Sequence, residues 1–203
     1  MSYPVPAALN CAEIEIKKSR FIAYAKGIQD RVEGMAWLAE LKAQYPDARH
    51  HCWAYLLGNP HCASNAGMGD DGEPSGTAGK PILNVLQHKG VGDIMIVVVR
   101  YFGGVKLGAG GLTRAYGQAA QAVMETLSVT EQVDMAVCDI HCDFALEQPV
   151  RHHLSLVDGM VLSVDYQRQV TLQVQFPEQA LAEFQASMAA LGCQLVLESE
   201  SEL

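Results

Sequence analysis

Two glycine-rich segments, with charged residues between the glycines, constrain this chain more than any other feature. They cover residues 70–81, DDGEPSGTAGKP, and residues 100–114, RYFGGVKLGAGGLTR. Glycine loses more backbone freedom on folding than any other residue, so a folded domain keeps it where the chain needs a positive φ angle or a close backbone approach. Loops of this kind commonly carry function, and we expect both segments to form a functional surface.

The composition indicates a soluble protein. The chain has 203 residues, 49% of them apolar, and no apolar run approaches the roughly 18 residues that a membrane span needs. Residues 1–10 lack a basic start followed by an apolar stretch, so we expect no secretory signal, no membrane contact and a cytoplasmic location. The six cysteines form no Cys-x-x-Cys pair, which in a reducing compartment indicates buried thiols without disulfides or structural zinc.

The charge distribution divides the chain in two. Residues 1–127 contain 12 Lys and Arg against 11 Asp and Glu, whereas residues 128–203 contain 2 against 12. Only the first part can therefore offer a polyanion a locally positive surface. We expect two domains, 1–127 and 133–203, each with its own core, joined by a linker at 128–132.

Hydrophobic periodicity predicts an α+β fold in both domains. In the first we expect strands at 12–18 and 20–28, which form either one bent strand or a hairpin around residues 17–19. They are followed by a helix capped by Asp30 that ends near Tyr45, a strand at 49–57, a long loop at 59–79, a helix at 80–88, a buried strand at 94–99 and a helix at 112–127. In the second we expect strands at 133–143, 161–166, 169–176 and 194–197, with helices at 147–156 and 178–191. This β-α-β-β-α-β order is typical of a ferredoxin-like sandwich.

The first glycine-rich segment places Gly79 and Lys80 at a predicted helix start, where free amides and the helix dipole favour an anion. It is not a P-loop, because Pro74 stands where the first glycine should be and Pro81 where the hydroxyl residue should be. The alternative is that these glycines only turn the chain and cap a helix.

The second glycine-rich segment offers groups that bind phosphate and stack on single-stranded bases. They are Arg100, Tyr101, Phe102, Lys106 and Arg114. The segment lacks the glycine spacing of a dinucleotide-binding fingerprint. The alternative is structural: the two rings pack beneath the glycines, and Arg100 pairs with an acidic residue of the first segment, Asp70, Asp71 or Glu73.

The same three carboxylates, together with His50, His51 and Cys52 on a predicted strand, raise the alternative of an enzyme or metal site. Adjacent strand residues point to opposite faces, so the two histidines cannot both bind one metal in simple geometry. We favour a solvated acidic loop and a core cysteine over a metal site or a nucleophile. The His152–His153 pair is assigned no role.

Several motifs together resemble the YigZ/IMPACT family: Lys18-Ser19-Arg20-Phe21, residues 48–54 (ARHHCWA), residues 70–74 (DDGEP), residues 76–81 (GTAGKP) and the segment from Val99 to Tyr116. The resemblance covers essentially the whole chain. It implies an N-terminal domain similar to a ribosomal protein domain and to domain IV of elongation factor G, followed by a ferredoxin-like domain. It also implies a role in translation, since the eukaryotic IMPACT proteins regulate translation initiation.

We therefore expect a binding protein without catalysis, cofactor or metal, associated with RNA or the ribosome or with a translation-related protein. The residues expected to contact RNA or another anion are Lys17, Lys18, Arg20, Lys80, Arg100, Tyr101, Phe102, Lys106 and Arg114. Two alternatives remain open. One is an enzyme or binder of a small phosphorylated ligand that uses the Asp70–Lys80 loop, and the other is a pure protein-interaction module.

Overall fold

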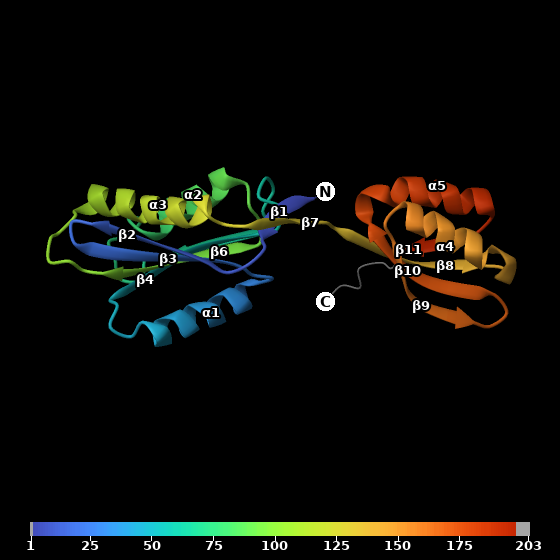
Figure 1. Cartoon of the computed structure of the whole chain (residues 1–203), viewed down its shortest axis with the longest axis horizontal. Coiled ribbons are helices and arrows are strands. Elements are labelled where there is room, and N and C mark those ends of the chain that lie inside the picture. The colour runs from blue at the N-terminus through green and yellow to red at the C-terminus, as the bar shows by residue number, and fades with distance from the viewer. Residues whose placement is uncertain (1, 198–203) are drawn as a thin grey trace. The chain divides into compact units, whose positions relative to one another are not determined.

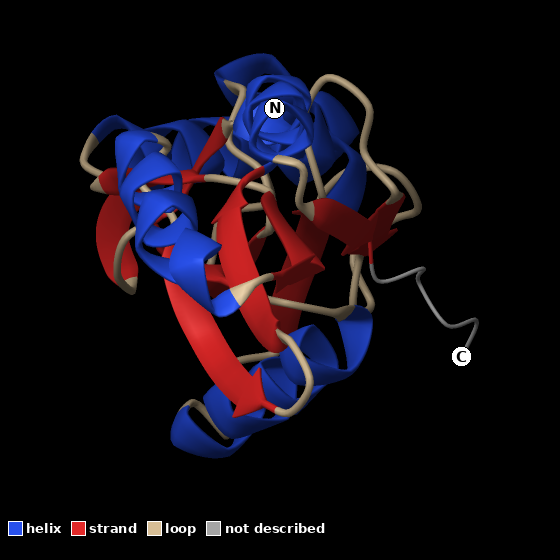
Figure 2. Cartoon of the chain, turned by 90° about the vertical axis from the view of Figure 1, so that its right-hand side faces the viewer, coloured by secondary structure: helices blue, strands red, loops and turns tan. Residues whose placement is uncertain are grey.

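The computed structural model describes residues 2–197, so residues 198–203 of the expected second domain lie outside the described part of the chain. Two compact units divide it: one is Tyr3–Gln132, and the other contains the described residues from Val133 onward. Helices and strands are mixed along the chain, as in an α+β protein (Figure 2). No helix within residues 2–197 is long and apolar enough to cross a membrane.

A five-stranded antiparallel sheet forms the centre of the N-terminal unit. Its strands, in spatial order, are β2 (Asn10–Ile16), β3 (Ser19–Gly27), β6 (Ile94–Tyr101), β4 (His50–Leu57) and β5 (Asn65–Gly69). Helices α2 (Gly79–Lys89) and α3 (Ala109–Glu125) cover one face, and α1 (Arg31–Gln44) covers the other (Figure 1). The central strand β6 is buried on both faces, which explains its continuous β-branched sequence.

Two hydrophobic cores lie on the two faces of this sheet. The larger core joins α2 and α3 to the sheet and includes Phe21 and Tyr116, whose rings meet edge to face at 5.3 Å. The smaller core joins α1 to the opposite face through Trp37 and Leu41. The expected cap of α1 is confirmed, because the side chain of Asp30 accepts a hydrogen bond from the amide of Glu33 at 2.8 Å.

The expected linker at 128–132 is wrong. Residues Val129–Gln132 form strand β7, which pairs antiparallel with β1 (Tyr3–Pro6) in a separate two-stranded sheet. The amide of Ala7 also donates to the carbonyl of Ser128 at 2.9 Å. These contacts join the two ends of the unit, so its first and last residues lie side by side and the unit ends at Gln132.

The expected single loop at 59–79 is also wrong, because strand β5 lies within it. The glycines of β5 are not typical of a strand, but the aromatic side chains of β4 that pack against β5 require them. A Cβ atom at Gly67 would lie 2.6 Å from the ring of Tyr55, and one at Gly69 would lie 2.5 Å from the indole nitrogen of Trp53. The centres of the two aromatic rings lie 5.9 Å apart in a stacked arrangement, and the rings cover Gly67 and Gly69, where a side chain would not fit.

The second unit has the ferredoxin-like order expected from the sequence. Its elements are β8 (Met135–Cys142), α4 (Glu147–Leu156), β9 (Met160–Tyr166), β10 (Val170–Pro177), α5 (Leu181–Leu191) and β11 (Gln194–Leu197), and the sheet order is β11-β8-β10-β9. Strand β10 could be predicted from the sequence because its buried and half-buried residues alternate. The buried residues pack with those of α4 and α5 in one core.

Candidate functional site

The start of α2 binds a carboxylate of the protein itself. The side chain of Asp70 accepts hydrogen bonds from the amides of Gly76 at 2.7 Å, Ala78 at 3.0 Å and Gly79 at 2.8 Å. Burial would raise the pKa of Asp70, but these three amides together lower the pKa below its usual value. The expectation of an external anion at Gly79 and Lys80 is therefore wrong, because Asp70 already occupies the amides.

Asp71 ties the same loop to two other elements. One carboxylate oxygen accepts from Lys42 Nζ at the end of α1, and the other accepts from the amide of His51 on β4, each at 2.7 Å. Burial opposes ionisation, but Lys42 and the His51 amide outweigh it and lower the pKa of Asp71. Within residues 2–197 no group of three His, Cys, Asp or Glu side chains is arranged to hold a metal ion.

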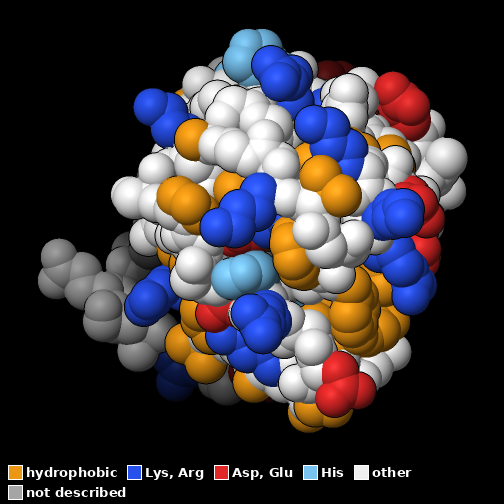
Figure 3. Space-filling model, turned by 90° about the vertical axis from the view of Figure 1, so that its left-hand side faces the viewer, with side chains coloured by type: hydrophobic (Ala, Val, Ile, Leu, Met, Phe, Trp, Pro, Cys, Tyr) orange, Lys and Arg blue, Asp and Glu red, His pale blue; other side chains and the backbone are white. Residues whose placement is uncertain are grey.

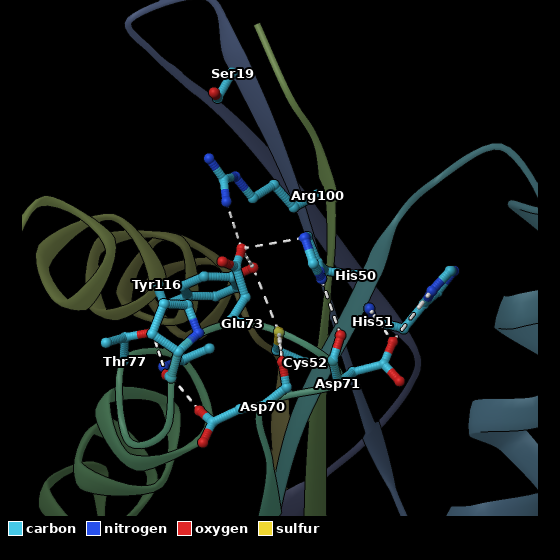
Figure 4. Close-up of polar contacts among 12 residues, drawn as sticks. Ser19, His50, His51, Cys52, Asp70, Asp71, Glu73, Thr77, Arg100 and Tyr116 are labelled. Atoms are coloured by element: carbon cyan, nitrogen blue, oxygen red, sulfur yellow. Dashed lines mark hydrogen bonds and ion pairs between the residues drawn. The ribbon is translucent and has the colours of Figure 1, made fainter. Parts of the chain in front are cut away.

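Glu73 lies at the centre of a buried polar cluster (Figure 4). Its Oε1 atom accepts from the Arg100 guanidinium of β6 and from the Tyr116 hydroxyl of α3 at 2.8 Å, and His50 Nε2 of β4 lies 3.9 Å away. The Glu73 side chain is 4% exposed and that of Arg100 is 7% exposed. The solvated acidic loop is thus wrong, and the alternative of an internal ion pair between Arg100 and an acidic residue of the first segment is confirmed.

Cys52 belongs to the core. Its thiol donates to the carbonyl of Asp70 at 2.9 Å and contacts the Tyr116 hydroxyl at 3.3 Å. Burial raises the pKa of the Cys52 thiol to about 12, and burial next to Cys52 and Glu73 raises the pKa of Tyr116 as well. Both groups are protonated at neutral pH, so neither is an activated nucleophile.

His50 and His51 point to opposite sides of β4, as expected (Figure 4). His50 Nδ1 lies 2.9 Å from the carbonyl oxygen of Asp71, on the same side as Glu73. His51 is buried on the other side, and burial lowers the pKa of its imidazole. The two rings therefore do not converge on one ligand.

The second glycine-rich segment packs against the hairpin turn between β2 and β3. This turn is a two-residue connection in which Lys17 and Lys18 have positive φ angles of 47° and 65°. The amide of Gly103 donates to Ser19 Oγ at 3.1 Å, and a Cβ atom at Gly103 would collide with the backbone of Lys18. Glycine at position 103 therefore brings the 102–108 loop against the turn.

A hollow of about 410 Å³ opens beside this loop, at the start of α3. Its wall contains the Glu73–Arg100 pair, His50 and two exposed cations, Arg49 and Lys106. The rest of the wall is Pro74, Phe102, Leu107, Gly108, Ala109 and Leu112. Phe102 is 51% exposed.

A smaller hollow of about 220 Å³ adjoins the first, and Leu107 lies in the walls of both. Its wall includes the exposed cations Lys17 and Arg114. The hairpin turn and the 102–108 loop lie at the same end of the sheet (Figure 1). Figure 3 looks at this end of the unit, where lysine and arginine side chains are spread over the surface with hydrophobic side chains and a histidine between them.

The structure thus brings together only some of the residues expected to bind RNA or an anion. Four of them line the two hollows: Lys17, Phe102, Lys106 and Arg114. We call the surface formed by these four residues and Arg49 the basic face. Lys18 lies beside Lys17 in the turn. Arg20 forms an ion pair with Glu13, with 2.8 Å between Nε and Oε1, and its guanidinium carbon lies 5.6 Å from the centre of the half-buried Tyr101 ring. Lys80 is exposed on α2 and lies outside both hollows.

Sequence reasoning missed Arg49 as a member of this face. Arg49 directly precedes β4, and its only local signal is its place before His50 at the start of the predicted strand 49–57. Lys106 is 57 positions further along the chain. Only the pairing of β4 with β6 brings Arg49 to the loop that follows β6.

The fold defines a two-unit α+β protein, and its N-terminal unit carries the basic face. The family model for the Impact N-terminal domain matches residues 17–124, and a domain of unknown function (DUF1949) matches residues 140–192. The chain belongs to the IMPACT family.

Relatives of known sequence match along nearly the whole chain. IMPACT family member YigZ of Escherichia coli is 40% identical over 191 residues, which cover 93% of this chain and 92% of that protein. An IMPACT family member of Haemophilus influenzae is 38% identical over 92% of this chain and 90% of its own. A crystal structure described as that of a hypothetical protein is 38% identical, covers 99% of this chain and 98% of its own, and has a TM-score of 0.73.

Proposed function

We propose that the protein binds single-stranded RNA, free or in the ribosome, through the basic face of its N-terminal unit, and acts in the regulation of translation. The observation that carries the RNA part is the convergence of Lys17, Arg49, Lys106 and Arg114 on two adjoining hollows. The translation part rests on the resemblance to the IMPACT family.

The state of these four cations supports the proposal. All four side chains are exposed, and among the described residues none has an acidic partner at ion-pair distance. In contrast, Arg20, Lys26 and Lys42 each bind a carboxylate. Unpaired cations on one face attract phosphates without first breaking an internal ion pair, and phosphate contacts supply most of the affinity for a nucleic acid.

The apolar part of the basic face favours a single strand over a duplex. Phe102 exposes half of its surface at the rim of the larger hollow, where an unstacked base can lie on its ring. Stacking of this kind contributes about 1–3 kcal/mol per base. Bases in a duplex are already stacked on each other and do not reach a ring at the rim of a hollow.

We infer a binding role without a catalytic step. The pKa values of Cys52 and Tyr116 are both raised by burial, so these groups remain protonated. The carboxylates of Asp70 and Asp71 are engaged by backbone amides and Lys42. These contacts hold the Asp70–Lys80 loop in place, and this loop contributes Glu73 and Pro74 to the wall of the larger hollow.

Sedimentation with ribosomes tests the proposal. The protein should pellet with ribosomes, and treatment with ribonuclease should release it. The double variant Lys106→Ala, Arg114→Ala should remain in the supernatant, whereas Arg31→Ala, Lys89→Ala should pellet like the parent. The control removes the same charge from exposed positions of the same unit that lie outside both hollows. Pelleting that resists ribonuclease and is the same for both variants would instead favour the protein-interaction module.

A further inference from the structure

We propose that the larger hollow holds one phosphate group of a nucleotide, bound by the first amides of α3 with Arg49 and Lys106 as its charge partners. The phosphate belongs either to an RNA strand or to a free mononucleotide. If the phosphate belongs to an RNA strand, the inference rests on the proposed function. If it belongs to a free mononucleotide, the inference is independent of the proposed function.

The first turn of α3 is open to an external anion. This 17-residue helix begins at Ala109, and its N-cap Gly108 has no side chain to bind the first amides. No acidic residue lies in the first turn. In the other two helices of the N-terminal unit a carboxylate already binds these amides: Asp30 in α1 and Asp70 in α2. Because Gly108 and Ala109 lie in the wall of the hollow, the positive end of the α3 dipole faces it.

A buried, incompletely paired guanidinium is the second, independent observation. The Arg100 side chain forms part of the wall and is 7% exposed. Its guanidinium carbon lies over two aromatic rings, 5.5 Å from the centre of Phe21 and 5.8 Å from the centre of Phe102. One terminal nitrogen binds Glu73, but Nε has no hydrogen-bond partner among the described residues. Buried guanidinium N–H groups rarely lack an acceptor, so the wall of the hollow contains a donor that the described residues leave unsatisfied.

The charges in the wall favour an anion in spite of Glu73. The carboxylate of Glu73 is 4% exposed, and its Oε1 atom is held by Arg100 and the Tyr116 hydroxyl. Glu73 and Arg100 therefore neutralise each other. Arg49 and Lys106 remain unpaired among the described residues. Their two positive charges match the nearly two negative charges of a terminal phosphate or a mononucleotide, and they exceed the single charge of a phosphodiester within an RNA strand.

The remaining wall has room for the group attached to the phosphate. A volume of about 410 Å³ is at the small end of ligand sites in proteins and is larger than a phosphate needs. Leu107, Leu112 and Phe102 give this space an apolar side. A nucleotide should therefore bind more tightly than inorganic phosphate, and a nucleoside should bind most weakly because it lacks the charged group.

The test uses the full chain, calorimetry and three probes: uridine 5′-monophosphate, uridine and inorganic phosphate. The variant Ala109→Asp places a carboxylate in the first turn of α3, where it competes for the amides and stabilises the helix. We expect uridine 5′-monophosphate to bind at least about tenfold more weakly to this variant, without loss of thermal stability. Gln87→Glu adds the same charge to an exposed position on α2 and should bind as the parent does. Equal binding by the parent and Ala109→Asp would overturn the phosphate site.

Oligouridylate with and without a 5′-phosphate separates the two sources and the two proposals. An RNA phosphate in the hollow would be supported if either oligonucleotide binds more strongly than the mononucleotide and if Ala109→Asp weakens that binding. Binding of the mononucleotide alone would support the site with a free nucleotide as ligand and would contradict the proposed RNA function. If replacing Lys17 and Arg114 by alanine weakens oligonucleotide binding but Ala109→Asp does not, the RNA function stands and the phosphate site is overturned.

Discussion

The carboxylate of Glu73 binds the guanidinium of Arg100 where both side chains are almost completely buried. The pair joins the first glycine-rich segment to the end of β6, from which the second glycine-rich segment continues. Tyr116 on α3 donates to the same carboxylate. One buried acid therefore fixes the positions of a loop, a strand and a helix that together form the wall of the larger hollow.

Breaking this pair should destabilise the N-terminal unit strongly. Glu73→Gln leaves the buried Arg100 without a compensating charge, and we expect the free energy of unfolding to fall by about 3–5 kcal/mol. The double variant Glu73→Leu, Arg100→Leu should lose less than the two single changes added together, because neither partner then leaves a buried charge behind. Urea unfolding measures both, and a loss below about 1 kcal/mol for Glu73→Gln would contradict the role of the pair.

The stability of the protein should depend on Asp70 and Asp71 at acid pH. Both have a pKa below the unfolded value of about 3.9. Their contribution is therefore complete above the unfolded pKa and is lost as the pH falls through the lower, folded pKa. We expect the free energy of unfolding to fall between about pH 5 and pH 2.

The variant Asp70→Asn assigns part of this pH dependence to one residue. It should be less stable than the parent at pH 7 by about 1–3 kcal/mol, because amides at the start of α2 lose a charged acceptor, and it should show a weaker acid dependence. Asp47→Asn, at an exposed position of the same unit, is the control and should change neither. An unchanged acid dependence in Asp70→Asn would contradict the assignment.

Gly103→Ala should loosen the basic face. The added Cβ would meet the backbone of Lys18, which cannot move without distorting the hairpin turn. We expect lower thermal stability and weaker RNA binding. Gly117→Ala, in the middle of α3 with nothing within 4 Å of its Cβ, should instead be neutral or stabilising by up to about 1 kcal/mol. Equal thermal stability of the two variants would show that the loop does not depend on this contact.

Cysteine labelling of the native protein should separate two classes of thiol. Cys11 and Cys62 are exposed, so the expectation of uniformly buried cysteines is wrong for these two. The other four are buried, and burial raises the pKa of Cys52 to about 12 and the pKa of Cys138 to about 11. Iodoacetamide at pH 7.5 should modify only Cys11 and Cys62 within minutes, as read by mass spectrometry. Rapid modification of Cys52 would reopen the enzyme alternative.

Much of the fold could be predicted from local patterns. Helix α4 and strand β11 have the bounds that periodicity predicts, because their apolar residues repeat at the spacing of one face. Strands β1, β5 and β7 were missed for different reasons. The pairing of β1 with β7 joins residues at opposite ends of the unit, and no local pattern reports it. Strand β5 has a glycine-rich sequence because aromatic rings from β4 cover it.

The sequence predicts which exposed cations of the glycine-rich segments lie at the candidate site. It does not predict the role of the residues in these segments that are buried in the fold. Lys106 and Arg114 line the hollows beside the loop, as their position in the sequence indicated. Asp70 and Arg100 also lie in these segments but are turned inward. The sequence shows their charge, whereas only the fold shows that the amides of α2 and the carboxylate of Glu73 bind them.

The salt dependence of single-stranded RNA binding tests the central claim most directly. Affinity of the parent for an oligouridylate should fall steeply as salt is added, because phosphate contacts release bound counterions. Lys106→Ala, Arg114→Ala should bind more weakly, and its plot of log affinity against log salt should be shallower by about 1.4, or 0.7 for each lost contact. The control Arg31→Ala, Lys89→Ala should keep the slope of the parent. If the Lys106→Ala, Arg114→Ala protein is folded and has the affinity and slope of the parent, the basic face does not bind RNA.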